Sequence, residues 1–354
     1  MLPPQPDLLI VHTGGGLGDV LLATGVVEAL LERFPGANVD FLCQNKTAPA
    51  LRDHPGIRQL WIWPAKGPGG MRAWWSWVGR LRARRYHGSL VLWSTTATAW
   101  LTRLAGIPHR VGQDSRLSYS FLFNHRVKVR SEHGDQHSHW SQILLDYARA
   151  LPGGRPLGEG PARVSLHISS EAEQQAQQLL APLAEAPGPL LGLHPFKGPP
   201  VALERWPLDV FAGWLATLER QMGARLVVTG SPAEAPWAHK LVELSGTRAL
   251  CLAGQTDVAT LAALSRRCDA FLCPDSGPMH VAAAAGARVL GIYAMEEDFP
   301  ARWAPLTKRC RILRPQPVGC PPGCRKPTCR DYRCYRTVCA QSLLEELAQL
   351  LQEA

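Results

Sequence analysis

The sequence predicts an α/β protein with two parallel-sheet halves. Apolar runs of strand length alternate with helical patterns along the 354 residues, an alternation that is typical of parallel α/β architecture. The alternation is interrupted at residues 186–189, Ala-Pro-Gly-Pro, and then starts again. A chain of this length is expected to hold two domains, since each could bury its own core.

The first half contains four predicted strands and three predicted helices, and one more helix leads to the break. Short apolar runs define the strands, and apolar residues at helical spacing define the helices. The strands are expected at Leu8–His12, Val39–Leu42, Gln59–Ile62 and Leu90–Trp93. The helices are expected at Val20–Phe34, Met71–Arg84, Thr96–Ala105 and Ser170–Ala184.

The second half repeats this pattern. Strands are expected at Leu190–His194, Arg225–Thr229, Ala270–Cys273 and Val289–Tyr293. Helices are expected at Leu208–Met222, Glu234–Leu244, Thr260–Arg267, Met279–Ala285 and Ser342–Gln352. We therefore expect domains at residues 1–186 and 187–340, followed by a terminal helix within residues 341–354. A cleft between two halves of similar size is the default place for a site.

Composition and charge restrict the class of protein. Hydrophobic residues make up 46% and charged residues 19%, which suits a soluble globular chain. The N-terminus has no basic leader and no apolar run approaches the length of a membrane span, so we expect a cytoplasmic protein. The net charge of +9 suits phosphorylated ligands, an anionic membrane or nucleic acid. No RNA- or DNA-binding signature is present, so no nucleic-acid partner is expected.

Much of the basic excess lies in Arg72–Arg85 and Lys308–Arg336. The first of these segments is rich in tryptophan, and a helix there would place Met71, Trp74 and Trp75 on one face with Val78 and Leu81. Basic charge beside aromatic residues suits peripheral contact with an anionic inner-membrane surface. A core-facing helix with a solvated basic face is the alternative, and the sequence leaves both open.

A glycine-rich turn follows the first strand. It contains Gly14, Gly15, Gly16 and Gly18, and Asp19 follows directly. Glycines allow close approach of a ligand or a backbone, and open sheets bind ligands at the carboxyl ends of their strands. The turn is not the dinucleotide fingerprint, because position 19 holds aspartate where the third glycine belongs. Asp19 could either cap the following helix or act in catalysis.

A second polar block, Asp275-Ser276-Gly277, follows the strand at Ala270–Cys273. Ser276 and Gly277 could present N–H groups and a hydroxyl to a diphosphate at the positive end of a helix. Asp275 could accept hydrogen bonds from sugar hydroxyls, and His280 would lie one turn into the same helix. The alternative is an ordinary helix cap with a packed histidine.

These motifs together resemble glycosyltransferase family nine, the ADP-heptose lipopolysaccharide heptosyltransferases. The resemblance covers most of the chain, from GLGDVLLATGVVEALLERFPGANVDFL through RWPLDVFAGWL, TGSPAE and the D-S-G-x-x-H block to a tail with cysteines. It implies a GT-B fold, with two Rossmann-like domains facing a central cleft. The acceptor would lie on the N-terminal domain and the nucleotide sugar mainly on the C-terminal one.

The resemblance also implies an inverting transfer of heptose, or a related sugar, from an ADP-sugar to a lipopolysaccharide-core or other glycan acceptor. Asp19 would be the general base, since the attacking hydroxyl must lose a proton. Glu234 matches the family acid that contacts the nucleoside. The family lysine two residues before Trp206 is replaced by Glu204, so we expect Arg205 or Lys197 to meet the phosphates.

No cofactor or metal is expected to be required, since the chain has no Asp-x-Asp motif and helix N-termini with Arg or Lys could stabilise the leaving diphosphate. A zinc or iron–sulfur site in the tail is the alternative. Its ligands would come from five cysteines spaced C-x3-C-x4-C-x4-C-x4-C: Cys320, Cys324, Cys329, Cys334 and Cys339.

Two other classes of function compete with the transferase. A nucleotide-binding oxidoreductase is disfavoured by the failed fingerprint and by the second strand, which ends in Cys43-Gln44 rather than an acid. A non-catalytic module for anionic glycolipid or nucleic acid would not need both Asp19 and the Asp275–His280 block.

Overall fold

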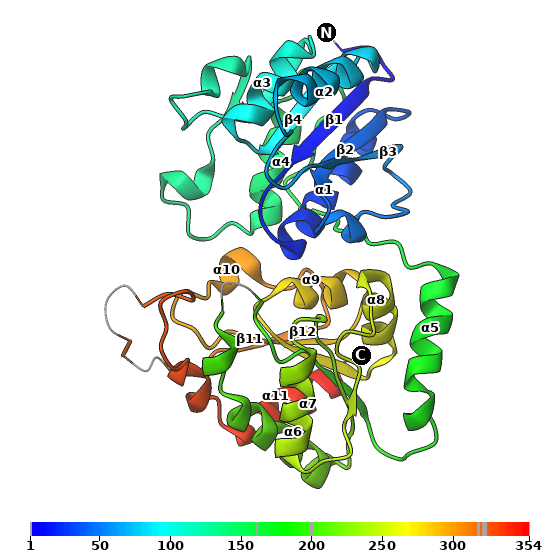
Figure 1. Ribbon diagram of the computed structural model, residues 1–354, viewed down its shortest axis with the longest axis vertical. Helices are drawn as coiled ribbons and strands as arrows, with labels where there is room; N and C mark the ends of the chain where they lie inside the picture. The colour runs from blue at the N-terminus through cyan, green and yellow to red at the C-terminus, as the bar shows by residue number, and fades with distance from the viewer. Residues whose placement is uncertain (1, 161, 199–200, 317–318, 321–323, 354) are drawn as a thin grey trace. The chain divides into compact units, whose positions relative to one another are not determined.

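The computed structural model describes residues 2–353 except 161, 199–200, 317–318 and 321–323. The described chain divides into two compact units, Met1–His167 and Ile168–Ala354 (Figure 1). Each unit is an α/β layer structure around one parallel sheet.

The sheet of the first unit has the strand order β3-β2-β1-β4-β5-β6, and every neighbouring pair is parallel. Its strands are β1 (Asp7–His12), β2 (Asn38–Gln44), β3 (Gln59–Trp63), β4 (Gly88–Trp93), β5 (His109–Gln113) and β6 (His125–Val127). β1 lies at the centre and is buried from Leu8 to His12. This burial on both faces explains its continuous apolar run.

Four helices cover this sheet: α1 (Leu17–Arg33), α2 (Met71–Ala83), α3 (Thr96–Leu104) and α4 (Trp140–Ala150). α1 packs beside α4, and α2 packs beside α3. One face of the sheet, with Leu9, Val11 and Val91, packs against buried side chains of α2 and α3.

The second unit repeats the design with the order β12-β11-β10-β7-β8-β9, again wholly parallel. Its strands are β7 (Leu190–Leu193), β8 (Arg225–Val228), β9 (Leu250–Cys251), β10 (Ala270–Pro274), β11 (Val289–Ile292) and β12 (Cys310–Leu313). Its helices are α5 (Ser170–Leu180), α6 (Leu208–Met222), α7 (Ala235–Ser245), α8 (Val258–Arg267), α9 (Gly277–Ala284), α10 (Pro300–Trp303) and α11 (Ala340–Gln352).

The core of the second unit is rich in aromatic residues. Trp206 packs against Phe211, Tyr332 and Tyr335, with ring centroids 4.9–5.6 Å apart. Leu343, Leu344, Leu347 and Leu350 of α11 join the same cluster. The terminal helix is therefore an integral part of this unit.

The two units divide at residue 167, earlier than the expected boundary at 186. The reason is α5, which packs on α8 of the second unit (Figure 1). Thr260 donates a hydrogen bond to Gln175 over 2.9 Å, and Glu173 pairs with Arg266 and Arg267. The Pro-Gly break at 186–189 is thus a turn inside the second unit.

Candidate functional site

Both sheets have a topological switch point, where the strand order reverses. It lies between β1 and β4 in the first unit and between β7 and β10 in the second. Loops that leave neighbouring strands in opposite directions open a crevice at this place, and ligands of α/β proteins bind there. The glycine-rich turn follows β1, and the Asp275 block follows β10, so both predicted motifs lie at switch points.

In the first unit, Asp19 lies in the first turn of α1. Its Oδ2 accepts a hydrogen bond from the Gly16 N–H over 2.7 Å, so the carboxylate folds back onto the turn. Asp19 thus contacts the start of α1 as a capping residue does, and it remains partly exposed. The backbone around it needs glycine: Gly15 has φ +66°, and a Cβ on Gly14 would lie 2.0 Å from the Trp93 indole.

His12 is a further polar residue at this switch point. Its side chain is buried, 5.8 Å from the Trp93 ring, and neither ring nitrogen has a hydrogen-bond partner among the described residues. Burial lowers the pKa of His12 to about 4, so the imidazole is neutral at pH 7. The neighbouring Thr13 hydroxyl is also buried without a partner in the described chain. Sequence reasoning used His12 only to end the strand.

In the second unit, a buried ionic centre lies at the switch point. Lys197, which follows β7, has its Nζ 3.5 Å from Asp275 Oδ2 and is paired more closely with Asp298. Asp298 follows β11, and its Oδ2 accepts from the Met295 N–H over 3.0 Å. Burial raises the pKa of Asp298, and the Lys197 ammonium beside it opposes that rise.

Glu234 lies beside this centre, in the turn after β8. It is 6% exposed, and its Oε2 accepts from the Ser231 N–H over 2.7 Å. The same oxygen is 4.0 Å from His194 Nε2, while His194 Nδ1 is 3.2 Å from Thr229 Oγ1. Burial lowers the pKa of His194, and Glu234 opposes this.

The Asp275 block opens α9 as expected. Ser276 precedes its first residue, Gly277, and the Ser276 hydroxyl lies 3.2 Å from Cys273 Sγ. His280, one turn into the helix, is 5% exposed. The structure thus brings Lys197, Asp275 and the start of α9 to one edge of the sheet.

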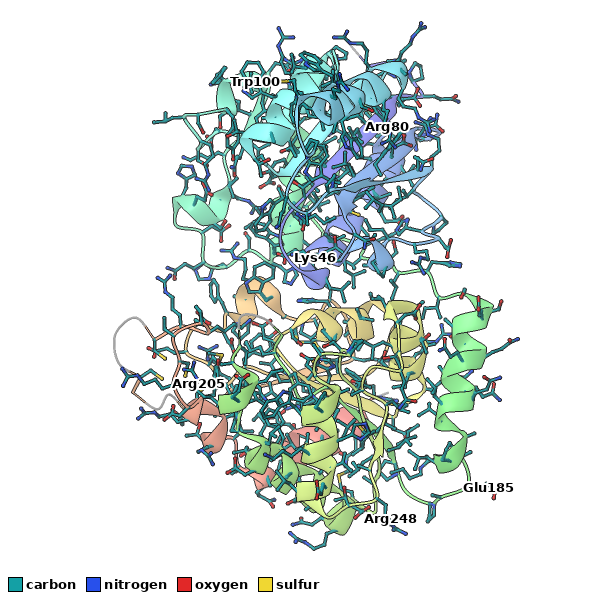
Figure 2. All side chains as sticks on the ribbon, in the orientation of Figure 1. Lys46, Arg80, Trp100, Glu185, Arg205 and Arg248 are labelled. Atoms are coloured by element: carbon teal, nitrogen blue, oxygen red, sulfur yellow. The ribbon has the colours of Figure 1, made fainter. Side chains whose placement is uncertain are left out.

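Arg205 lies elsewhere in this unit, in the short turn Leu203–Arg205, and its side chain is exposed. Its guanidinium donates to the Cys329 carbonyl oxygen over 3.0 Å, which ties it to the tail (Figure 2).

The tail cysteines have different environments. Cys329 and Cys334 are buried in the aromatic core, and Cys339 caps α11 by accepting from the Ser342 N–H. Within the described ranges, no three or more His, Cys, Asp or Glu side chains are arranged to hold a metal ion.

Comparison with known proteins agrees with this architecture. The family model for glycosyltransferase family 9 (heptosyltransferase) matches residues 74–334. Lipopolysaccharide heptosyltransferase 2 of Salmonella typhimurium is 25% identical over 95% of this chain and 96% of its own length. The Escherichia coli protein of the same name is 26% identical over 84% of this chain and 85% of its own length.

Three solved structures are similar in fold. A family 9 glycosyltransferase from Veillonella parvula has a TM-score of 0.79 at 18% identity, covering 99% of this chain and 98% of its own. Escherichia coli ADP-heptose heptosyltransferase II has a TM-score of 0.74 at 22% identity, covering 98% of each chain. An Escherichia coli heptosyltransferase with ADP-2-deoxy-2-fluoro heptose has a TM-score of 0.68 at 17% identity, covering 97% of this chain and 99% of its own.

Two Rossmann-like parallel sheets with this likeness define the GT-B class of glycosyltransferase, as the sequence predicted. Because the family model matches most of its length, the chain belongs to glycosyltransferase family 9, the heptosyltransferase family.

Proposed function

We propose that this enzyme transfers heptose from ADP-heptose to an acceptor of the lipopolysaccharide core, with Asp19 as the general base. The observation that carries the proposal is the different chemistry of the two switch points. The first offers one carboxylate on an open glycine turn, and the second offers an ionic centre beside a helix N-terminus. The relatives named lipopolysaccharide heptosyltransferase and the neighbour solved with an ADP-heptose analogue support this donor and this acceptor.

The proposed step is a single displacement at the anomeric carbon. The acceptor hydroxyl gives its proton to the Asp19 carboxylate as its oxygen bonds to the sugar. The bond from the anomeric carbon to the diphosphate oxygen breaks, ADP leaves with the electron pair, and the anomeric configuration inverts. Asp19 already accepts one hydrogen bond through Oδ2, which holds the carboxylate in a fixed orientation.

The donor is proposed to bind at the second switch point. Glu234 would accept hydrogen bonds from the ribose hydroxyls, a role that carboxylates have in other nucleotide sites. Ser276, Gly277 and the start of α9 would receive the diphosphate. Of the two cations that the sequence offers, Lys197 lies at this edge of the sheet, whereas Arg205 is bonded to the tail. Asp275 and His280 would face the sugar. Charge that develops on the leaving diphosphate would then be stabilised by groups of the protein.

The experiment that tests the donor is a thermal-shift comparison of ADP-heptose with GDP- and UDP-sugars, followed by an assay of transfer to heptose-deficient lipopolysaccharide. A ligand of the native state raises its stability by mass action, so ADP-heptose is expected to give the largest shift. A larger shift with a GDP- or UDP-sugar, or no transfer of heptose, would contradict the proposal.

We also propose peripheral contact with an anionic inner-membrane surface at the cytoplasmic face, through α2. No helix in the described part of the chain is long and apolar enough to cross a bilayer. The face of α2 differs from the expected one: Trp77, Val78 and Leu81 are buried, whereas Met71 is 71% and Trp75 52% exposed. Trp77 packs against the core residue Trp63. The Arg80 guanidinium carbon lies 4.5 Å from the centroid of the Trp77 ring.

Exposed Met71 and Trp75, with Arg72 beside them, form the part of α2 that could enter a lipid interface. Binding to phosphatidylglycerol vesicles is expected to weaken as salt rises, because surface charges are screened. The variants Trp75→Ser and Arg72→Gln should both bind less, and Arg248→Gln, an exposed arginine of the second unit, should bind like the wild type. Binding that ignores salt and these variants would contradict the proposal.

A further inference from the structure

Lys197, the cation beside the Asp275 block, is already paired with carboxylates of the protein. Lys197 is 3% exposed and is shared between the carboxylates of Asp275 and Asp298. With both carboxylates ionised, these three groups carry a net charge of −1 (+1 − 2). A diphosphate at this edge of the sheet would therefore need a further positive charge.

Lys326, in the cysteine-bearing tail, stands beside this centre. Its backbone N–H donates to Glu297 Oε1 over 2.8 Å, and Glu297 directly precedes Asp298. Burial and the Lys197 ammonium lower the pKa of Lys326, whereas Asp275, Asp298 and Glu297 raise it. Its side chain is thus half-buried in the field of the ionic centre. In the described chain, its ammonium group has no hydrogen-bond or ion-pair partner.

The loop that carries Lys326 is fastened to the segment before Trp206. The Tyr332 hydroxyl donates to the Lys326 carbonyl oxygen over 3.1 Å and accepts from the Ala202 N–H over 2.9 Å. Arg205 donates to the Cys329 carbonyl oxygen over 3.0 Å. Tyr332 is itself buried against Trp206. The segment where the family has its phosphate lysine, and where this chain has Glu204 and Arg205, therefore supports the loop of another lysine.

We propose that Lys326 is the cation that contacts the diphosphate of the donor in this enzyme, and that Arg205 is a positioning residue for its loop. The inference rests on the proposed function and deepens it. The acidic turn that ends in Asp298 neutralises Lys197, and the loop held by Arg205 supplies a replacement for the lysine lost at Glu204.

The test measures the affinities of wild type, Lys326→Met and Lys326→Arg for ADP and for adenosine by calorimetry. A hydrogen bond to a charged group contributes enough that Lys326→Met should weaken ADP binding by about 10- to 100-fold. Adenosine has no phosphate, so its affinity should not change. Lys326→Arg should keep most of the ADP affinity, since guanidinium also binds phosphate. Lys308→Met, which removes an exposed lysine of the same unit, should behave like the wild type.

Equal ADP affinity in Lys326→Met and wild type would overturn the inference, and so would a parallel loss of adenosine binding. A failure of the proposed function gives a different result: a wild type that prefers UDP or GDP refutes the adenine donor. The comparison of the Lys326 variants is then made with the preferred nucleotide. A wild type that binds none of the three diphosphates would overturn both.

The positioning role of Arg205 is tested by a double-mutant cycle. Arg205→Gln should weaken ADP binding in the wild type but change it little in Lys326→Met, because it acts through that lysine. Independent, additive effects would show that Arg205 does not act through Lys326.

Discussion

The two sheets share one strand order but differ in what they hold at the switch point. The first unit presents a neutral, buried His12, glycines beside Trp93 and a single carboxylate, Asp19. The second presents a buried lysine between two carboxylates, with a third acid, Glu234, nearby. The strand order decides where a site forms, and the loop residues decide its ligand. A carboxylate on a glycine turn suits removal of a proton from an acceptor hydroxyl, and an ionic centre beside a helix N-terminus suits a nucleotide diphosphate.

The comparison predicts that a change of Asp275 affects the affinity for ADP-heptose and the affinity for free ADP differently. Asp275→Asn should weaken ADP-heptose binding by about 10- to 100-fold, because a charged acceptor for sugar hydroxyls is lost. Free ADP should bind at least as tightly as before, since removal of a carboxylate makes the centre more positive. Calorimetric titration of both ligands checks this. A matched fall in ADP affinity would mean that Asp275 supports the phosphate site instead of the sugar.

The neutrality of His12 at the first switch point is tested by pH. The pKa of His12 is about 4 in the folded protein against 6.5 in the unfolded chain, so the unfolded state binds more protons below pH 6.5. Its contribution to stability is present above pH 6.5 and is lost as the pH falls toward 4. Between pH 7 and 5 the loss should be about 2 kcal/mol.

His12→Leu should remove this part of the pH dependence in chemical denaturation, and His133→Leu, at an exposed histidine, should not. Identical pH profiles for His12→Leu and wild type would show that folding does not lower the pKa of His12.

Replacing a glycine of the turn by alanine should change the stability of the protein by an amount that depends on the position. Gly14→Ala places a Cβ 2.0 Å from the Trp93 indole, whereas on Gly16 the nearest atom is 3.6 Å away. Trp93 is 39% exposed and its ring can move. We therefore expect Gly14→Ala to lower the free energy of unfolding by about 1–2 kcal/mol, and Gly16→Ala to lower it by less than about 1 kcal/mol. Both variants should bind ADP normally. Reduced ADP affinity in Gly14→Ala would contradict the separation of the two sites.

Sequence reasoning located the central strands because their burial on both faces leaves a continuous apolar run. It missed β5, β6, β9 and β12. The sequences of β5 and β6, HRVGQ and HRV, mix basic and apolar residues at one edge of the sheet. The domain boundary was misplaced because a Pro-Gly break marks a turn and does not reveal which unit a helix packs against. The attachment of α5 depends on tertiary contacts such as Gln175 with Thr260.

The candidate site was predictable where residues lie within one motif. Asp19, Glu234 and the Asp275 block each follow a strand directly, so their place at a sheet edge follows from the local sequence. Asp298 and Lys326 were not found, because only the folding of the tail and of the turn after β11 brings them to Lys197. A lysine in a basic, cysteine-rich tail carries no sequence signal that separates it from its neighbours.

The central claim is that the first unit supplies the base and the second binds the donor. The most direct measurement is the transfer rate and the ADP-heptose affinity of Asp19→Asn, compared with the wild type. Asparagine keeps the size and the capping oxygen but cannot take a proton, so the rate should fall by about 10²–10⁴-fold. Donor affinity should stay unchanged. A near-normal rate would show that Asp19 is only a helix cap, and a fall in affinity that matches the fall in rate would assign it to binding.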